Sequence, residues 1–572
     1  MTVAKLNTGS SDPKPKQTPP RRRSLTADAF SPRNLCKKLI RVIFVLIAFV
    51  VYGILVPIFL ICMLPVYMYR GIVVILQKIF HPEWAGIMCS RDALVGLDNT
   101  TKRSECMIMA ILIFRGVPDV KKCTEHIQKK VMEAKNTRGE YLYRKFTYYY
   151  ENWLGFPFWK KEADFKLEKH FRQFDYKIKT KPTGANGVEE SVTEDELLRY
   201  MGEIEALPFP KGQSPWEIMI LPNYIPREGD LHKDYAVPEM TVTDWNDPNG
   251  NVENGKYFAL VFRIHHAIGD GYSCMKMLMC HICNEPLDTV PKAPIRHYNI
   301  FTRIVQYIAI LVLTPYYHFN QFFVEIDSSL WHLSTNQLAK KSHFVSTERI
   351  PLESLKQVGK AHKVPMTGVF LAGLAGGIHN FLKLSGKGHQ IPKFMRAFSP
   401  MPWEDHPAFT TNGLVNHWTV GVFGIPVSQD TPHKRLRACK KSMNRLINSP
   451  ILVSNFWTVP ILLSAPNFMT SFWGTNWMTS MILSNFPGPK DTPTGFDGKH
   501  QLDNLFTFVP HMRGSAGLGI MFPTCMGNAR CTVSVDTAIL KDYSDAQFLV
   551  SLIDEEFRIL RTLHSPHAEN RV

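Results

Sequence analysis

The sequence predicts a fold of the α+β class, because strands and helices are mixed along the chain without regular strand–helix alternation. Residues 257–264 are aromatic and β-branched, as in a buried strand, and residues 272–283 place apolar side chains at helical spacing. Residues 517–525 and 529–535 alternate in polarity around Met526-Gly527-Asn528, a pattern typical of a β-hairpin. These patterns favour an α+β fold over a parallel α/β sheet.

The length predicts two subdomains, because 572 residues exceed the size of one ordinary hydrophobic core. We expect a first subdomain at residues 84–295, a connector at 296–345 and a second subdomain at 346–572. Within the second, residues 365–382 predict a buried, glycine-containing helix, and a last helix begins at Ser544. The apolar face of that last helix comprises Phe548, Leu549, Leu552, Ile553, Phe557 and Leu560.

The N-terminal tail carries much of the positive charge. Residues 1–41 contain ten Lys or Arg and two Asp, which together supply half of the net charge of +16. The basic residues stand among Pro and Ser, a composition that indicates a disordered tail. No nucleic-acid-binding motif follows the tail, so nucleic acid is not an expected partner. The charge instead predicts a cytosolic N-terminus and attraction to anionic lipid.

Residues 42–69 are uncharged, between Arg41 and Arg70, and predict a membrane segment. At about 1.5 Å per residue in a helix, they are long enough to span a bilayer. Pro57 and Pro65 also allow a re-entrant hairpin that enters and leaves on the same side. A spanning segment would place the rest of the chain in the lumen, and a hairpin would leave it in the cytosol.

Two further stretches are apolar. Residues 304–313, flanked by Arg303 and two tyrosines, are too few to span a bilayer, and they predict either an interfacial helix or a buried core helix. Residues 451–486 are rich in Trp, Met and Phe and are interrupted by Pro460 and Pro466. They predict either a membrane contact or the wall of an apolar tunnel.

The eleven cysteines do not predict a metal site. They are scattered along the chain, and only Cys280 and Cys283 have CxxC spacing. No second pair lies nearby to complete a tetrahedral site. Because this pair falls within the predicted helix at 272–283, burial is the expected role of both thiols.

The motif of greatest information is His-His-Ala-Ile-Gly-Asp-Gly at residues 265–271, which fits the pattern HHxxxDG. It joins the predicted buried strand to the predicted helix, where a rigid scaffold can direct a side chain into a cleft. A neutral imidazole with a pKa near ~6.5 can accept a proton from a hydroxyl group. Asp270 can fix the loop through hydrogen bonds, and Gly271 allows either a positive φ or the close approach of a ligand.

The motif and its neighbours resemble the wax ester synthase/diacylglycerol acyltransferase (WSD-type) family of the HHxxxDG acyltransferase superfamily. Residues 164–172 resemble the Asp-Phe…His-x-Arg segment of that family, and residues 484–489 resemble its Asn-x-Pro-Gly-Pro motif. Residues 214–217 resemble its Pro-Leu-Trp strand without the Leu, and residues 414–416 its Gly-Asn segment with Val415 in place of Gly. The membrane segment and a polar insertion at about residues 226–255 depart from the bacterial members.

This resemblance implies two chloramphenicol-acetyltransferase-like halves, with a tunnel that reaches the second histidine from both sides. It implies that His266 is the general base, that His265 shapes the loop, and that Asp270 and Gly271 support it. Asn416 is a candidate oxyanion donor by resemblance, with a structural turn role as the alternative. The expected substrate-binding residues are Trp216, Asn485, Pro487, Gly488 and Pro489.

The expected reaction is acyl transfer from acyl-CoA, the co-substrate, to a lipid hydroxyl, with no cofactor and no metal. A fatty alcohol would give a wax ester, and diacylglycerol would give triacylglycerol. We expect an endoplasmic reticulum membrane or lipid droplet location. Two alternatives stay open: a catalytically inactive lipid-binding or scaffold protein of the same fold, and glycerol-phosphate acyltransferase chemistry at His170…Asp175, whose spacing fits the loose HxxxxD pattern.

Overall fold

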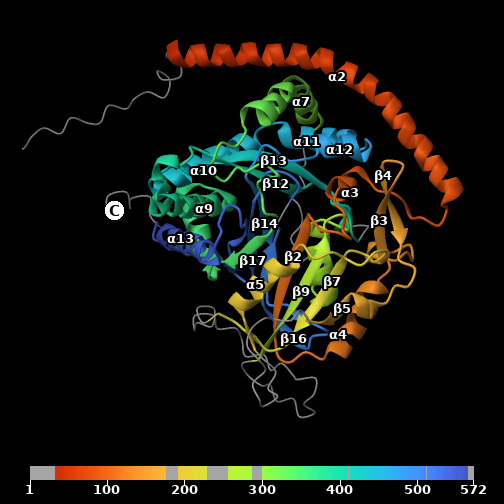
Figure 1. Cartoon of the computed structure of the whole chain (residues 1–572). Coiled ribbons are helices and arrows are strands. Elements are labelled where there is room, and N and C mark those ends of the chain that lie inside the picture. Colours follow the sequence, from red (N-terminus) through yellow and green to blue (C-terminus); the bar gives the residue numbers. More distant parts are fainter. Residues whose placement is uncertain are drawn as a thin grey trace, which may run out of the picture.

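The computed structural model describes residues 32–174, 191–227, 256–286, 299–409, 413–509 and 512–563. Two sheets form the centre of this part of the chain, and helices cover them (Figure 1). The two sheets meet where strands β16 (His500–Phe508) and β17 (Leu518–Cys525) contact each other. The chain is therefore built from two halves that share one seam.

The first sheet has six strands in the order β15-β16-β2-β9-β7-β5. Its pairs are antiparallel, apart from the parallel pair of β5 and β7. The central strand β2 is apolar and buried along almost its whole length, because neighbours flank it on both sides. Besides β16, its strands are β15 (Thr494–Gly495), β2 (Met107–Arg115), β9 (Tyr257–His265), β7 (Trp216–Leu221) and β5 (Phe171–Gln173).

The second sheet has eight strands, six of them in the order β10-β19-β17-β14-β12-β13. β14 pairs in parallel with both β12 and β17, so the sheet is mixed. Besides β17, its strands are β10 (Ser342–Ser346), β11 (Ile350–Pro351), β12 (Met395–Pro402), β13 (Trp418–Ile425), β14 (Met481–Pro487), β18 (Asn528–Ala529) and β19 (Thr532–Asp536).

Small sheets and helices complete the two halves. One sheet joins β1 (Gly86–Ile87), β4 (Phe156–Lys161) and β3 (Tyr148–Trp153), and another joins β6 (Val192–Thr193) and β8 (Tyr224–Ile225). The helices of the first half are α3 (Ser90–Val95), α4 (Val120–Ile127), α5 (Glu194–Ile204) and α6 (Gly271–Met277). The later helices are α7 (Ile300–Phe319), α8 (Leu352–His362), α9 (Met366–Leu382), α10 (Pro432–Ile447), α11 (Ile451–Leu462), α12 (Asn467–Trp473) and α13 (Tyr543–Arg561).

Several predicted elements are present in the structure. β9 covers the predicted buried strand, and α6 with the π-turn Leu278–Ile282 covers the predicted helix after the motif. The hairpin between β17 and β18 turns at Met526 and Gly527, which both have positive φ, as a two-residue turn of type I′ requires. On α13, Phe548 departs from the prediction because its side chain is exposed, whereas its neighbour Leu549 is buried.

The predicted boundary between the halves needs a correction. β15 and β16 come from the predicted second subdomain, yet β16 pairs with β2 in the first sheet. β10, in turn, begins the second sheet within the predicted connector. A strand can leave its own half because the buried edge of the neighbouring sheet offers unpaired N–H and C=O groups, which a local pattern does not reveal.

The N-terminal region also differs from the prediction. Residues 1–31 lie outside the described residues, but 32–41 are helical rather than a disordered tail. They open the single helix α2 (Pro32–Phe80), which runs through Pro57 and Pro65 without a hairpin and arches over one side of the molecule (Figure 1). Among the described residues, one helix, Val42–Phe80, is long and apolar enough to cross a membrane, and the bent pair Ile300–Ile308 and Ile310–Val324 meets the same criterion if it is taken as one span.

Helix α9 forms the centre of the second half, and three glycines let α13 approach it closely. A Cβ atom on Gly377 would stand 2.3 Å from Ile553 Cγ1 and 2.8 Å from the Cα of the same residue. Because the backbone of α13 cannot yield as a side chain does, we expect Gly377→Ala to lower the free energy of unfolding by about 1–3 kcal/mol.

Chemical denaturation of the purified protein in detergent measures this effect. Gly388→Ala is the matched control, because the nearest atom to its added Cβ is 3.8 Å away. Equal unfolding midpoints for the two variants would contradict the close helix contact.

Candidate active site

The HHxxxDG motif forms a tight turn between β9 and α6, and hydrogen bonds to Asp270 stabilise this turn. Asp270 caps α6 by accepting hydrogen bonds from the N–H and hydroxyl of Ser273 (2.9 and 3.0 Å). Its other oxygen accepts from His406 Nε2 (2.9 Å) and from the N–H of His417 (2.8 Å). Burial alone would raise the pKa of Asp270, but these hydrogen bonds outweigh it and lower the pKa. Asp270 is thus an anion that ties the first half to the second.

His265 also has a supporting position. The residue is fully buried, and its Nδ1 accepts a hydrogen bond from the N–H of Ala267 (3.2 Å). Its Nε2 faces Asp98 Oδ2 at 3.1 Å and the Tyr150 hydroxyl at 3.4 Å. With both ring nitrogens occupied, His265 is not free to exchange protons with a substrate. This placement agrees with the predicted role in shaping the loop.

His266 faces the opposite way. Its Nδ1 lies 3.0 Å from Asn416 Oδ1. The Asn416 amide must present its oxygen to the ring, because its NH2 group donates to Asp92 Oδ1 (2.9 Å) and to the carbonyl of His266 itself (2.9 Å). His266 Nδ1 therefore carries the proton, and Nε2 keeps its lone pair.

This arrangement corrects the expectation for Asn416. The resemblance suggests an oxyanion donor, but the amide NH2 group already donates to Asp92 and to the carbonyl of His266, and the residue is not part of the cavity lining. Its oxygen accepts from His266 and from Trp418 Nε1 (3.2 Å). Asn416 is thus a positioning residue for His266.

A buried ion pair holds Asn416 in turn. Asp92 on α3 accepts from Asn416 and pairs with Lys145 Nζ at 2.8 Å. Both charged side chains are largely buried, and each satisfies the other. A chain of contacts therefore runs from Lys145 through Asp92 and Asn416 to the imidazole of His266.

The pKa of His266 is lowered. Burial is the largest cause, because it disfavours the imidazolium, and the charge of Asp270 opposes it. The residue is half-buried and lies in the cavity lining. His266 is therefore neutral at pH 7, as a proton acceptor must be.

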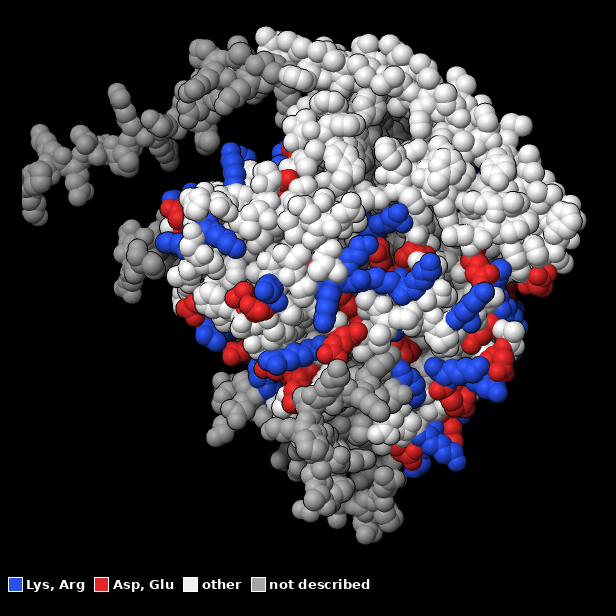
Figure 2. Space-filling view, viewed as in Figure 1, with Lys and Arg blue, Asp and Glu red and all other residues white. Residues whose placement is uncertain are grey.

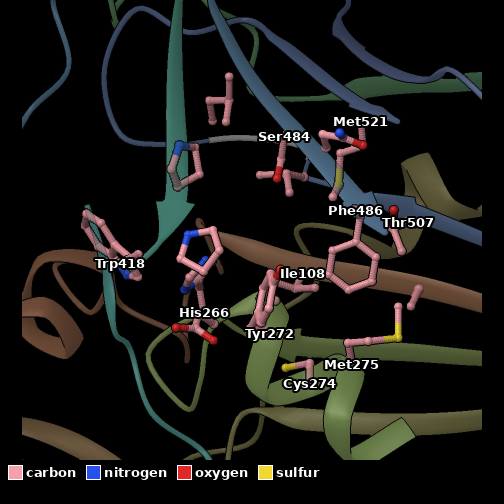
Figure 3. Close-up of a pocket in the computed structure, with 18 of the residues that line it drawn as sticks. Ile108, His266, Tyr272, Cys274, Met275, Trp418, Ser484, Phe486, Thr507 and Met521 are labelled. Carbon is pink, nitrogen blue, oxygen red and sulfur yellow. The ribbon is translucent and has the colours of Figure 1, made fainter. Parts of the chain in front are cut away.

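The cavity lies between the two halves, with His266 in its wall (Figure 3). It holds about 1130 Å³ of space, including open solvent at its mouth. Most of its lining is apolar and comes from both sheets, and its hydroxyl groups belong to Tyr272, Ser484 and Thr507. The buried hydroxyl oxygen of Thr507 has no hydrogen-bond partner in the described residues. This composition suits a long apolar substrate with a few polar atoms.

Gly271 and Asn485 both line the cavity, as expected of site residues. A Cβ on Gly271 would stand 3.1 Å from the Phe486 ring, so the absence of a side chain lets this ring approach the backbone closely. The other reading, a positive φ at Gly271, is wrong, because its φ lies outside that range. Asn485 is exposed at this wall, on β14.

The Pro487, Gly488 and Pro489 segment lies outside the cavity lining. The N–H of Gly488 donates to the carbonyl of Thr524 (2.8 Å), and a Cβ there would stand 2.2 Å from that oxygen. The glycine thus allows β14 to leave the sheet beside β17. The segment supports the tunnel wall through backbone geometry instead of lining it.

Trp216 is also outside the cavity lining and belongs to the core. Its indole N–H donates to the carbonyl of Phe146 (2.7 Å), and its ring stacks on His170 at 4.6 Å. His170 is fully buried and contacts Glu162 and the carbonyl of Trp216. The histidine of the alternative His170…Asp175 site is therefore a core residue that a substrate does not reach. Asp175 lies outside the described residues.

The described ranges contain no group of three or more His, Cys, Asp or Glu side chains that could hold a metal ion. Cys283 is buried and Cys280 is half-buried on the turn after α6. Burial raises the pKa of the Cys280 thiol to about 11, so the thiol is protonated at neutral pH.

Sequence reasoning missed five residues of the site: Asp92, Asp98, Lys145, Tyr150 and His406. Each is a single polar residue without a motif, far along the chain from residues 265–271. Nothing in the neighbouring sequence distinguishes them from ordinary surface residues. Their roles become visible only when the two halves meet.

Comparison with known proteins agrees with this architecture. Residues 415–561 match the family model of the WS/DGAT C-terminal domain. The wax ester synthase/diacylglycerol acyltransferase from Marinobacter aquaeolei VT8 has a similar fold, with a TM-score of 0.51 and 15% identity over 83% of this chain and 98% of that chain. No curated protein sequence matches.

Two further solved structures are similar over most of their length. The first condensation domain of the calcium-dependent antibiotic synthetase has a TM-score of 0.49 and 13% identity, covering 84% of this chain and 96% of its own. Trichothecene 15-O-acetyltransferase from Fusarium sporotrichioides has a TM-score of 0.49 and 11% identity, covering 83% and 95%.

The fold prediction is confirmed: the chain has an α+β fold with two chloramphenicol-acetyltransferase-like halves. The domain match and this fold support an acyltransferase. More narrowly, residues 415–561 match the WS/DGAT C-terminal domain, and the fold resembles that of a wax ester synthase/diacylglycerol acyltransferase.

The position of Asn416 yields a prediction. Asn416→Ala frees the His266 ring, and a misdirected base should lower kcat for acyl transfer by about 10²-fold, with little change in the KM for the acyl donor. Because Asn416 acts through His266, the double variant with His266→Ala should be no slower than His266→Ala alone. A further loss of similar size in the double variant would give Asn416 an independent role.

Proposed function

We propose that this protein is a membrane-bound O-acyltransferase that moves a fatty acyl group from acyl-CoA to a lipid hydroxyl, with His266 as the general base. The family match supports acyltransferase activity. The observation that carries the proposal is the contact between His266 Nδ1 and Asn416, which leaves Nε2 unprotonated in the wall of the cavity. His266 thereby has both the protonation state and the access that a base needs.

The proposed reaction proceeds without a covalent acyl-enzyme. The acceptor hydroxyl gives its proton to His266 Nε2 as its oxygen forms a bond to the thioester carbon. The C–S bond then breaks, and the imidazolium returns the proton to the departing CoA thiolate. The products are a lipid ester and free CoA, and the enzyme is restored.

The cavity supports lipid substrates. Its walls combine side chains such as Met275, Leu278, Phe398 and Met521 from both halves. Burial of a long alkyl chain against them gains about 0.8 kcal/mol per CH2 group. A long-chain alcohol would give a wax ester, and diacylglycerol would give triacylglycerol; both bring a hydroxyl to the end of an apolar body. The apolar helix α2 supports a membrane location, which we propose to be the endoplasmic reticulum or a lipid droplet surface.

The proposal predicts that His266→Ala abolishes acyl transfer, because no other group replaces the base. Membranes with either protein are incubated with labelled palmitoyl-CoA and either hexadecanol or diacylglycerol, and labelled wax ester or triacylglycerol is measured. We expect at least a 10²-fold loss of product in the variant, with membrane association intact. His389→Ala, at an exposed histidine, is the control.

The acceptor consumed in that assay identifies the product class. Retained transfer by His266→Ala would overturn the mechanism. An absence of transfer by the unmodified protein with both acceptors would instead favour a lipid-binding or scaffold role.

The lowered pKa of His266 sets the pH dependence. The base must be neutral, so activity falls as the pH drops through its pKa, which burial holds below the usual 6.5. We therefore expect the acid limb of the profile of kcat/KM against pH to have its midpoint below pH 6.5. A midpoint above 6.5 would mean that an anion, rather than burial, dominates the surroundings of the ring.

A further inference from the structure

One side of the molecule carries most of the exposed apolar side chains. They belong to α2, α7, α11 and α12, which we call the apolar platform. In Figure 2 the visible face of α7 and of the described part of α2 is almost entirely uncharged, whereas acidic and basic side chains cover the opposite part. The most exposed side chains of the platform outside α2 are Ile300, Phe301, Leu311, Trp457, Phe468 and Phe472. An exposed apolar surface of this extent marks a site of contact with a membrane or another protein.

Within the apolar platform, helix α2 lies along the other three helices. The ring of Phe59 contacts Trp473 of α12 at 6.4 Å, and the Tyr67 hydroxyl donates to the carbonyl of Ile461 on α11 (2.9 Å). Arg70 donates to the carbonyl of Met88 (3.1 Å), and Val73 is buried against β4. The helix also contacts α7. The helix thus contacts α7, α11, α12 and β4 along one side.

The length of α2 also argues against a simple crossing. The apolar part, Val42–Phe80, has 39 residues. At about 1.5 Å per residue it extends about 58 Å, roughly twice the hydrocarbon thickness of a bilayer. A helix of this length that stays against the domain surface suits a position in the plane of one leaflet.

A basic cleft adjoins the platform. Its walls include Tyr317 of α7 and Ile451 of α11, so it opens beside the apolar surface. Four cationic residues, Lys393, Arg396, Lys441 and Arg445, line the cleft together with one acidic residue, Glu325.

Glu325 pairs with Arg396 (3.2 Å) and with Arg445. Lys393 and Lys441 are exposed and have no ion-pair partner among the described residues. Excess positive charge at the edge of an apolar surface complements a phosphate at the surface of a bilayer.

We propose that the protein is monotopic: the apolar platform lies in one leaflet, with α2 in the membrane plane, and the basic cleft takes the headgroup of an anionic phospholipid. The domain and the N-terminus then lie on the same side of the membrane. The inference deepens the membrane location within the proposed function, but it does not depend on the transfer chemistry. It assigns the surface to an anionic leaflet instead of a second copy of the chain or a protein partner.

A topology measurement tests the in-plane arrangement. The full chain is expressed with different epitopes at its two ends, and intact microsomes are treated with protease. We expect both epitopes to be degraded and the exposed sequon at Asn99 to carry no glycan. Protection of either epitope, or a glycan on Asn99, would show that α2 crosses the membrane and would overturn the proposal.

Photocrosslinking tests whether α12 meets lipid. Phe472, which is 83% exposed, is replaced by p-benzoylphenylalanine in the full chain, and microsomes are irradiated. We expect a phospholipid adduct by mass. The same replacement at Leu384, which is 63% exposed outside the platform, is the matched control and should give none. A protein adduct, or equal lipid adducts at both sites, would overturn the assignment of this surface.

Ligand binding in detergent tests the cleft apart from catalysis. Native mass spectrometry of the full chain compares dihexanoyl phosphatidylserine, dihexanoyl phosphatidylcholine, inorganic phosphate and adenosine 3′,5′-bisphosphate. We expect phosphatidylserine to bind best, and the Lys393→Gln/Lys441→Gln variant to bind it on the order of tenfold more weakly. The Lys356→Gln/Lys360→Gln variant on α8 is the control.

Equal binding of phosphatidylserine by the two variants would show that the basic cleft does not bind the headgroup. Tighter binding of the nucleotide would assign the cleft to the CoA moiety, and tighter binding of free phosphate would assign it to a simple anion. Because His266 contributes to none of these measurements, their outcome is independent of the transfer assay.

Discussion

The site depends on one hydrogen bond, between the Asn416 oxygen and His266 Nδ1, which crosses the seam between the two halves. It fixes the tautomer of a ring whose pKa is already lowered by burial, so the free nitrogen faces the cavity. The amide keeps this orientation only because Asp92 and two backbone carbonyls take its N–H bonds. Lys145 then balances the charge of Asp92. A neutral amide suits this position, because a carboxylate there would favour the imidazolium.

The same seam is held by backbone pairing. β16 leaves the second half of the chain and pairs with β2 of the first sheet, while its neighbour β17 lies in the second sheet. Asp270 joins the loop at His406 and His417 to the motif turn. The two walls of the cavity are therefore parts of one cooperative structure. A tunnel that must hold a flexible chain next to a base benefits from such rigidity, because small displacements of the reacting atoms reduce the rate greatly.

The interior cavity and part of the outer surface of the protein are both apolar. The cavity is lined mainly by apolar side chains from both halves, and the apolar platform extends over α2, α7, α11 and α12 on the outside. α11 connects the two regions. Its Phe456 stacks on Trp403, and the guanidinium of Arg91 lies over the Phe456 ring. Arg91 Nε in turn donates to the carbonyl of Trp418, a residue of the cavity wall. A lipid acceptor that is insoluble in water gains from an enzyme whose outer surface is also covered by lipid.

The sequence by itself determined the local elements and pointed to the histidine pair of the candidate site. Periodicity predicts β9, α6, α9 and the hairpin at Met526-Gly527, because burial imposes repeats of about two or 3.6 residues. The pattern at residues 265–271 predicts His266 as the base. Only the tertiary structure decided that Asn416 positions the ring, that Trp216 packs in the core, and that β16 joins the first sheet. These roles depend on contacts between residues far apart in the chain, such as Asp92 and Asn416, and a local pattern holds no information on which distant polar group completes a hydrogen bond.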